Sequence, residues 1–69
     1  MAEPPLDDPV YDLILCLQQA LEDCVRYDAF AADARAKGDD ELASFFDELS
    51  SSDREIAGRA KDMLRARLG

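Results

Sequence analysis

A single glycine, Gly38, separates two long stretches in which apolar residues recur every three or four positions. That spacing places the recurring residues on one face of an α-helix. The first stripe comprises Val10, Leu13, Ile14, Leu17, Leu21, Cys24, Tyr27, Ala31 and Ala34. The second comprises Leu42, Phe45, Phe46, Leu49, Asp53, Ile56, Ala60, Met63 and Leu64, and it can extend to Leu68. The sequence therefore predicts an all-α chain of two amphipathic helices.

The residues that flank the stripes indicate where each helix begins and ends. Asp8 followed by Pro9 is typical of a helix start, because the carboxylate accepts from an early amide and proline fits the first helical position. Gly38 suits the left-handed conformation that often follows a helix, and the three acids at 39–41 stabilise the next start. We expect the helices at about 9–37 and about 39–67.

Only two or three residues connect the helices, so they must run antiparallel as a hairpin. The hairpin forms a single domain at 9–69, and the acidic, proline-rich residues 1–8 are predicted to be a flexible tail. One alternative stays open, since Ser52 and Glu55 fit a capping box that could start a third helix. The stripe crosses the serines in phase, with Leu49 and Ile56 on one side, which favours a continuous second helix.

The charge of the chain narrows the classes of partner. The 69 residues carry 16 Asp and Glu against 8 Lys and Arg, a net charge of −8, and no His. This balance repels phosphate backbones and anionic headgroups, so neither nucleic acid nor membrane is expected as a partner. Residues 1–53 contain 14 acids and three bases, whereas residues 54–69 contain two acids and five bases. The basic last segment is predicted to complement the helix dipole or, alternatively, to dock an acidic protein.

The two cysteines do not form a disulfide framework. Cys16 and Cys24 lie eight positions apart in one helix, too far along its axis to bridge each other. The longest apolar run, 13–17, is five residues, too short for a transmembrane helix or a signal sequence. A cytoplasmic location is therefore expected.

A two-helix hairpin has one seam, which covers only part of two wide apolar stripes. A second copy is the simplest cover, because two hairpins related by a twofold axis make a four-helix bundle with a common core. We therefore expect a homodimer or a higher oligomer. The residues predicted to form its core are Leu13, Leu17, Leu21, Phe45, Phe46, Leu49 and Ile56.

The chain also resembles a known family. The matching residues are Tyr27, Phe30, Ala31, Ala34, Gly38, Leu42, Ala43, Phe46 and Ala57, without a gap. In this pattern the chain resembles one helical hairpin of rubrerythrin and related ferritin-like proteins. Its length is similar to that of encapsulated ferritins, in which two-helix subunits dimerise. The resemblance implies a ferritin-like four-helix bundle.

The same resemblance implies where di-iron ligands would lie. The family takes a Glu from the first helix and a Glu-x-x-His pair from the second. These positions fall on Ala20, Asp53 and Ile56, so one acidic residue of the three is retained. The resemblance thus supports the fold and argues against ferroxidase or peroxidase activity, with no cofactor expected.

Asp53 is the polar residue in the middle of the second stripe, where an unpaired carboxylate is costly. The register places it near Cys24 and within a turn of Tyr27. We expect a buried polar pair of Asp53 with Tyr27, or satisfaction by a serine, by water or at the bundle edge. A weaker alternative is a metal site in which Asp53 and Cys24 of two chains meet at a twofold axis.

These observations predict a small non-catalytic ferritin-like module for assembly or interaction. An alternative from a different class is a metal-binding ferritin-like protein, related to iron storage or oxidation, with an atypical or partner-completed site. A third is an adaptor whose basic last segment binds an acidic protein.

Overall fold

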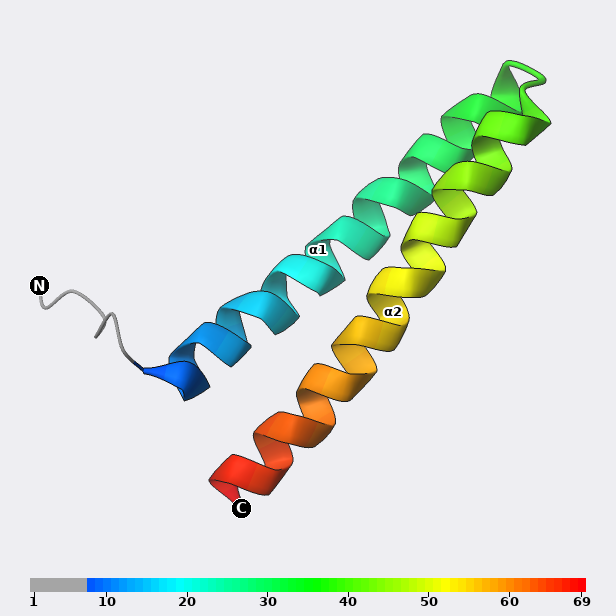
Figure 1. Cartoon of the computed structure of the whole chain (residues 1–69). Coiled ribbons are helices and arrows are strands. Elements are labelled where there is room, and N and C mark those ends of the chain that lie inside the picture. Colours follow the sequence, from blue (N-terminus) through cyan, green and yellow to red (C-terminus); the bar gives the residue numbers. More distant parts are fainter. Residues whose placement is uncertain (1–7) are drawn as a thin grey trace, which may run out of the picture.

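The computed structural model describes residues 8–69, which form an antiparallel pair of long helices (Figure 1). Helix α1 spans Pro9–Ala36 and helix α2 spans Asp40–Leu68. The helical hairpin predicted from the two stripes is confirmed, with helix ends within one residue of the expected positions. Of the predicted tail at 1–8, only Asp8 lies among the described residues.

Both helix starts are capped by an aspartate. The Asp8 side chain accepts hydrogen bonds from the amides of Val10 (3.0 Å) and Tyr11 (3.1 Å), and Pro9 occupies the first helical position. The Asp39 side chain accepts from the amide of Leu42 at 3.1 Å. Each cap satisfies backbone donors that would otherwise lack an intrahelical partner.

The chain reverses its direction between the two helices at Gly38. Its φ is +76°, in the left-handed region that glycine enters without steric cost. The amide of Asp39 then donates to the carbonyl of Ala34 at 2.9 Å, which closes the end of α1. The turn brings the end of α1 beside the beginning of α2 and leaves the other end of the hairpin open (Figure 1).

Helix α2 continues through Ser50, Ser51 and Ser52 without interruption, so the alternative of a third helix is wrong. The physical reason lies in where the Ser50 side chain bonds. Its hydroxyl donates to Asp28 of α1 at 2.7 Å rather than to the backbone of its own helix. The serine therefore ties the two helices together instead of ending one of them.

The seam between the helices is built from small side chains. The buried residues of residues 8–69 are Ala20, Cys24, Ala31, Ala34, Ala43, Ser50, Ala57 and Ala60. Many recur every seven positions, as Ala43, Ser50 and Ala57 do, which is the repeat of a coiled coil. Because the seam uses the small members of each helix, most large apolar side chains are left at its edges or outside it.

Candidate interaction surface

One flank of the seam is charged. Arg54 of α2 pairs with Asp28 of α1 at 2.6 Å, and Arg35 of α1 pairs with Asp47 of α2. We call these four residues the charged face. All four side chains are largely exposed, so each pair contributes little to stability. The hydrogen bond that Arg35 donates to the Asp47 carboxylate raises the pKa of the guanidinium, which remains fully protonated.

Asp28 links the charged face to the seam. Its Oδ1 accepts from the hydroxyl of Ser50, which is 1% exposed, and its Oδ2 accepts from Arg54. The Ser50 hydrogen bond lowers the pKa of Asp28, helped by Arg54 and opposed by partial desolvation. The thiol of Cys24 lies 3.5 Å from the Ser50 carbonyl and donates to it. The seam is thus crossed by a polar link at its centre.

The opposite flank is apolar and belongs mainly to α2. Leu42, Leu49, Ile56 and Met63 follow one another at intervals of seven, which places them in one row beside the seam. Phe45 lies next to this row, one turn along the helix. Ile56 is 47% exposed and Phe45 is 52% exposed. These large side chains therefore remain accessible in the single chain.

Two residues of α1 join this flank. Phe30 packs edge-on against Phe46 with ring centroids 5.4 Å apart, and Cys16 lies four turns earlier on the same side of α1. We define the apolar face by these exposed or half-buried residues: Leu42, Phe45, Leu49, Ile56 and Met63 of α2, with Cys16 and Phe30 of α1.

The apolar face has a shallow hollow near each end. One hollow, near the turn, is lined by Phe30, Asp33, Ala34, Lys37, Asp39, Leu42 and Phe46. The other, near the open end, is lined by Leu13, Cys16, Ile56, Arg59, Ala60 and Met63. Small alanines form part of both hollows, so a large side chain from another molecule has room to enter.

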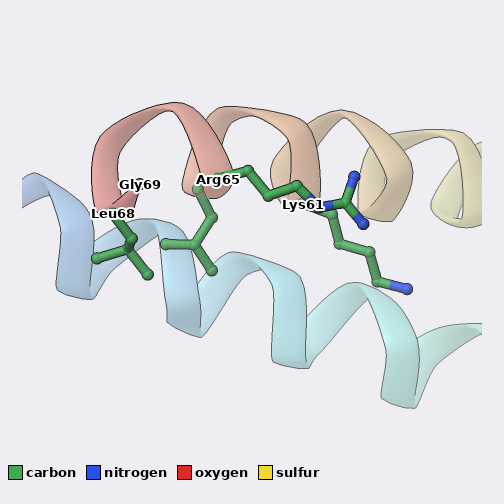
Figure 2. A pocket seen from close by; sticks show the side chains of 5 residues that line it. Lys61, Arg65, Leu68 and Gly69 are labelled. Carbon is green, nitrogen blue, oxygen red and sulfur yellow. The ribbon is translucent and has the colours of Figure 1, made fainter.

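A third hollow lies at the open end and is partly basic. It is lined by Lys61, Leu64, Arg65, Leu68 and Gly69, the last turns of α2 (Figure 2). Arg65 also pairs with Asp62 at 3.2 Å within α2. Two of the five bases of the last segment, Lys61 and Arg65, therefore line this hollow.

The seven residues predicted to form a dimer core are divided among three places. Leu13 and Leu17 of α1 are half-buried along the seam, as is Phe46 of α2. Phe45, Leu49 and Ile56 belong to the apolar face. Leu21 is exposed and lies seven residues before Asp28, hence on the flank of the charged face.

The polar residues selected from the sequence differ in burial. Asp53 and Tyr27 are half-buried, and Cys24 is 5% exposed in the seam. Of the positions implied by the ferritin-like resemblance, Ala20 is buried in the seam and Ile56 lies on the apolar face. Within residues 8–69 the structure contains no group of three or more potential His, Cys, Asp or Glu metal ligands.

The link from Ser50 to Asp28 was not predicted from the sequence. The available signal was the interval of seven that joins Ala43, Ser50 and Ala57. It places Ser50 in one row with two small alanines, and a serine that is buried in such a row needs a hydrogen-bond partner.

Comparisons with protein-family models, curated proteins and solved structures gave no match to this chain. The resemblance to ferritin-like hairpins therefore stays a prediction. No helix in the described part of the chain combines the length and apolar character needed to cross a membrane.

Proposed function

We propose that the chain is a non-catalytic assembly module whose apolar face pairs with a second copy to make a four-helix bundle. The observation that supports this is the row of Leu42, Leu49, Ile56 and Met63, which provides a large aliphatic side chain at every seventh residue of α2 outside the seam. An apolar row that is sustained over three such intervals is the pattern of a second helix-packing surface.

The energetics of the single chain favour a second copy that covers the apolar face. Every fully buried side chain of residues 8–69 is small, so the seam buries little apolar area per residue. On the apolar face Leu42, Phe45, Ile56 and Met63 are 43–52% exposed, and each would contribute on the order of 1 kcal/mol when the remainder is covered. For a short chain with a small core, several such contributions from each copy decide whether the fold is stable.

The proposed bundle agrees in architecture with the ferritin-like arrangement expected from the residue pattern, without the family's di-iron ligands. We also propose a cytoplasmic location, because a secreted domain of this size is usually held together by several disulfides and this sequence has only two cysteines.

Sedimentation equilibrium of the full chain tests the proposal. The expected mass is twice the 7.7 kDa of one chain. Ile56→Glu should lower the mass toward that of a monomer, because a charge on the apolar face cannot be desolvated without a partner. The matched control is Val25→Glu on the other flank, where Val25 is 71% exposed, and it should leave the dimer intact. A helical monomer at all concentrations for the unchanged chain overturns the proposal.

A further inference from the structure

We propose that the second copy packs with its helices reversed, so that α2 lies against α2 of the partner and α1 against its α1. The twofold axis is then perpendicular to the helices and passes level with the middle of the apolar face. This inference rests on the proposed self-association and adds its orientation. Three independent features of the surface fit this arrangement.

The first feature is the symmetry of the aliphatic row. The midpoint of Leu42, Leu49, Ile56 and Met63 falls between Ser52 and Asp53. Reversal about that midpoint brings Leu42 opposite Met63 and Leu49 opposite Ile56 of the other copy. Each aliphatic side chain then meets another aliphatic one, and the small side chain of Ser52 allows close approach at the axis.

The second feature is the match of Phe45 to a hollow. About the same midpoint, Phe45 is opposite Ala60, an alanine that lines the hollow near the open end together with Cys16 and Arg59. Phe45 is the most exposed aromatic side chain of the apolar face, at 52%. The hollow of each copy would thus receive the phenyl ring of the other, with the Arg59 guanidinium beside an aromatic face.

The third feature is charge. Residues 39–53 contain six acids and no base, whereas residues 54–69 contain five bases and two acids. Reversal sets the acidic half of one α2 against the basic half of the other.

The charges of α1 match in the same way. The twofold axis is level with Cys24 of α1, because Cys24 contacts Ser50 in the middle of α2. On the α1 side of the apolar face, reversal about the point between Cys24 and Val25 brings Asp12 opposite Lys37 and Asp23 opposite Arg26.

The competing twofold arrangement has its axis parallel to the helices. It would lay α1 of one copy over α2 of the other, and so place Asp23 and Arg26 on the aliphatic row around Ile56. Asp23 and Arg26 pair with each other at 2.6 Å within α1, and this ion pair would lose water against aliphatic side chains without gaining a partner on the other copy. The distribution of apolar residues on α2 and of charge on α1 therefore favours the reversed arrangement.

Distances between spin labels distinguish the two orientations. Glu55 and Asp62 are exposed, lie seven residues apart on the outward side of α2, and avoid the apolar face. Glu55→Cys and Asp62→Cys are each made in a chain that also carries Cys16→Ser, so that each copy has one reactive thiol for the label. The control is Cys16→Ser alone treated with the label, which checks that buried Cys24 does not react.

In the reversed dimer the two Glu55→Cys labels are offset along the axis by five residues, about 8 Å, and the two Asp62→Cys labels by nineteen residues, about 28 Å. The Asp62→Cys distance should therefore be clearly the longer. Equal distances at the two positions, with a dimeric mass, overturn the orientation and leave the proposed assembly standing. A monomeric mass for the unlabelled chain overturns both.

Discussion

The hydroxyl of Ser50 donates a hydrogen bond to Asp28 across the seam at 2.7 Å, from a position where Ser50 is 1% exposed. This bond fixes the rotation and the axial register of α2 against α1, because a buried hydroxyl is costly to leave without a partner. Alanines surround Ser50 along its row, and they would tolerate a shift of one helix past the other. The polar link therefore gives specificity to a seam whose apolar residues are nearly interchangeable.

The link makes the stability of the hairpin depend on pH. The Ser50 hydrogen bond, helped by Arg54, holds the pKa of Asp28 below its ordinary value of 3.8. A lowered carboxyl pKa contributes stability that is present above 3.8 and is lost as the pH falls below it. Ser50→Ala should therefore be less stable than the unchanged chain at neutral pH, and the difference should shrink in acid. Chemical denaturation at several pH values measures this effect.

Ser51→Ala is the matched control, since Ser51 is the next residue, is exposed, and lies away from Asp28. It should change the stability equally at every pH. If Ser50→Ala and Ser51→Ala show the same dependence on pH, the link does not hold the pKa of Asp28 down.

The seam should resist larger side chains. Ala57 is 3% exposed between the helices, so Ala57→Leu must separate them or adopt a strained rotamer. We expect a loss of about 1–3 kcal/mol in the free energy of unfolding, although leucine is the more apolar residue. Ala29→Leu, the same change at an exposed position of α1, should be nearly neutral. A stabilised Ala57→Leu chain would show that the seam is loosely packed.

The helix ends were predictable because local chemistry determines them. Asp8 with Pro9 and Gly38 with Asp39 act through bonds to residues a few positions away, so no knowledge of the partner helix is needed. The hairpin followed for the same reason, since a short connection leaves the second helix only one direction.

The composition of the seam was harder to predict. Periodicity identifies an apolar side of a helix, but it does not say which rows on that side face the neighbouring helix. The large residues Ile56 and Phe45 dominate the apolar pattern, yet the alanines beside them form the contact, because only small side chains allow the helices to approach closely. The partner of Ser50 was likewise hidden, because it depends on the register between two helices.

The two glycines with open surroundings should respond in opposite directions to alanine. Gly38 has φ +76°, so Gly38→Ala should cost about 1–2 kcal/mol through backbone strain, although no atom lies within 4 Å of the added methyl group. Gly58 is helical and its added methyl group also meets nothing within 4 Å. Gly58→Ala should therefore stabilise the chain by about 1 kcal/mol, because glycine is a poor helix former. Thermal unfolding followed by circular dichroism compares the two, and equal effects would contradict the left-handed turn.

Asp53 is the one acidic residue retained at the ligand positions of the ferritin-like resemblance, and its substitution tests whether it binds metal. It is half-buried and shares a row with Phe46 and Ala60, so its carboxylate is partly removed from water within an otherwise apolar row. If Asp53 has only a structural role, Asp53→Leu should raise the free energy of unfolding by about 1 kcal/mol. Glu55→Leu, at an exposed position, should change it by less than about 0.5 kcal/mol. Elemental analysis of both variants and of the unchanged chain, all purified without chelator, tests the opposite role. Zinc or iron that is bound by the unchanged chain and by Glu55→Leu, but not by Asp53→Leu, would show that Asp53 is a metal ligand.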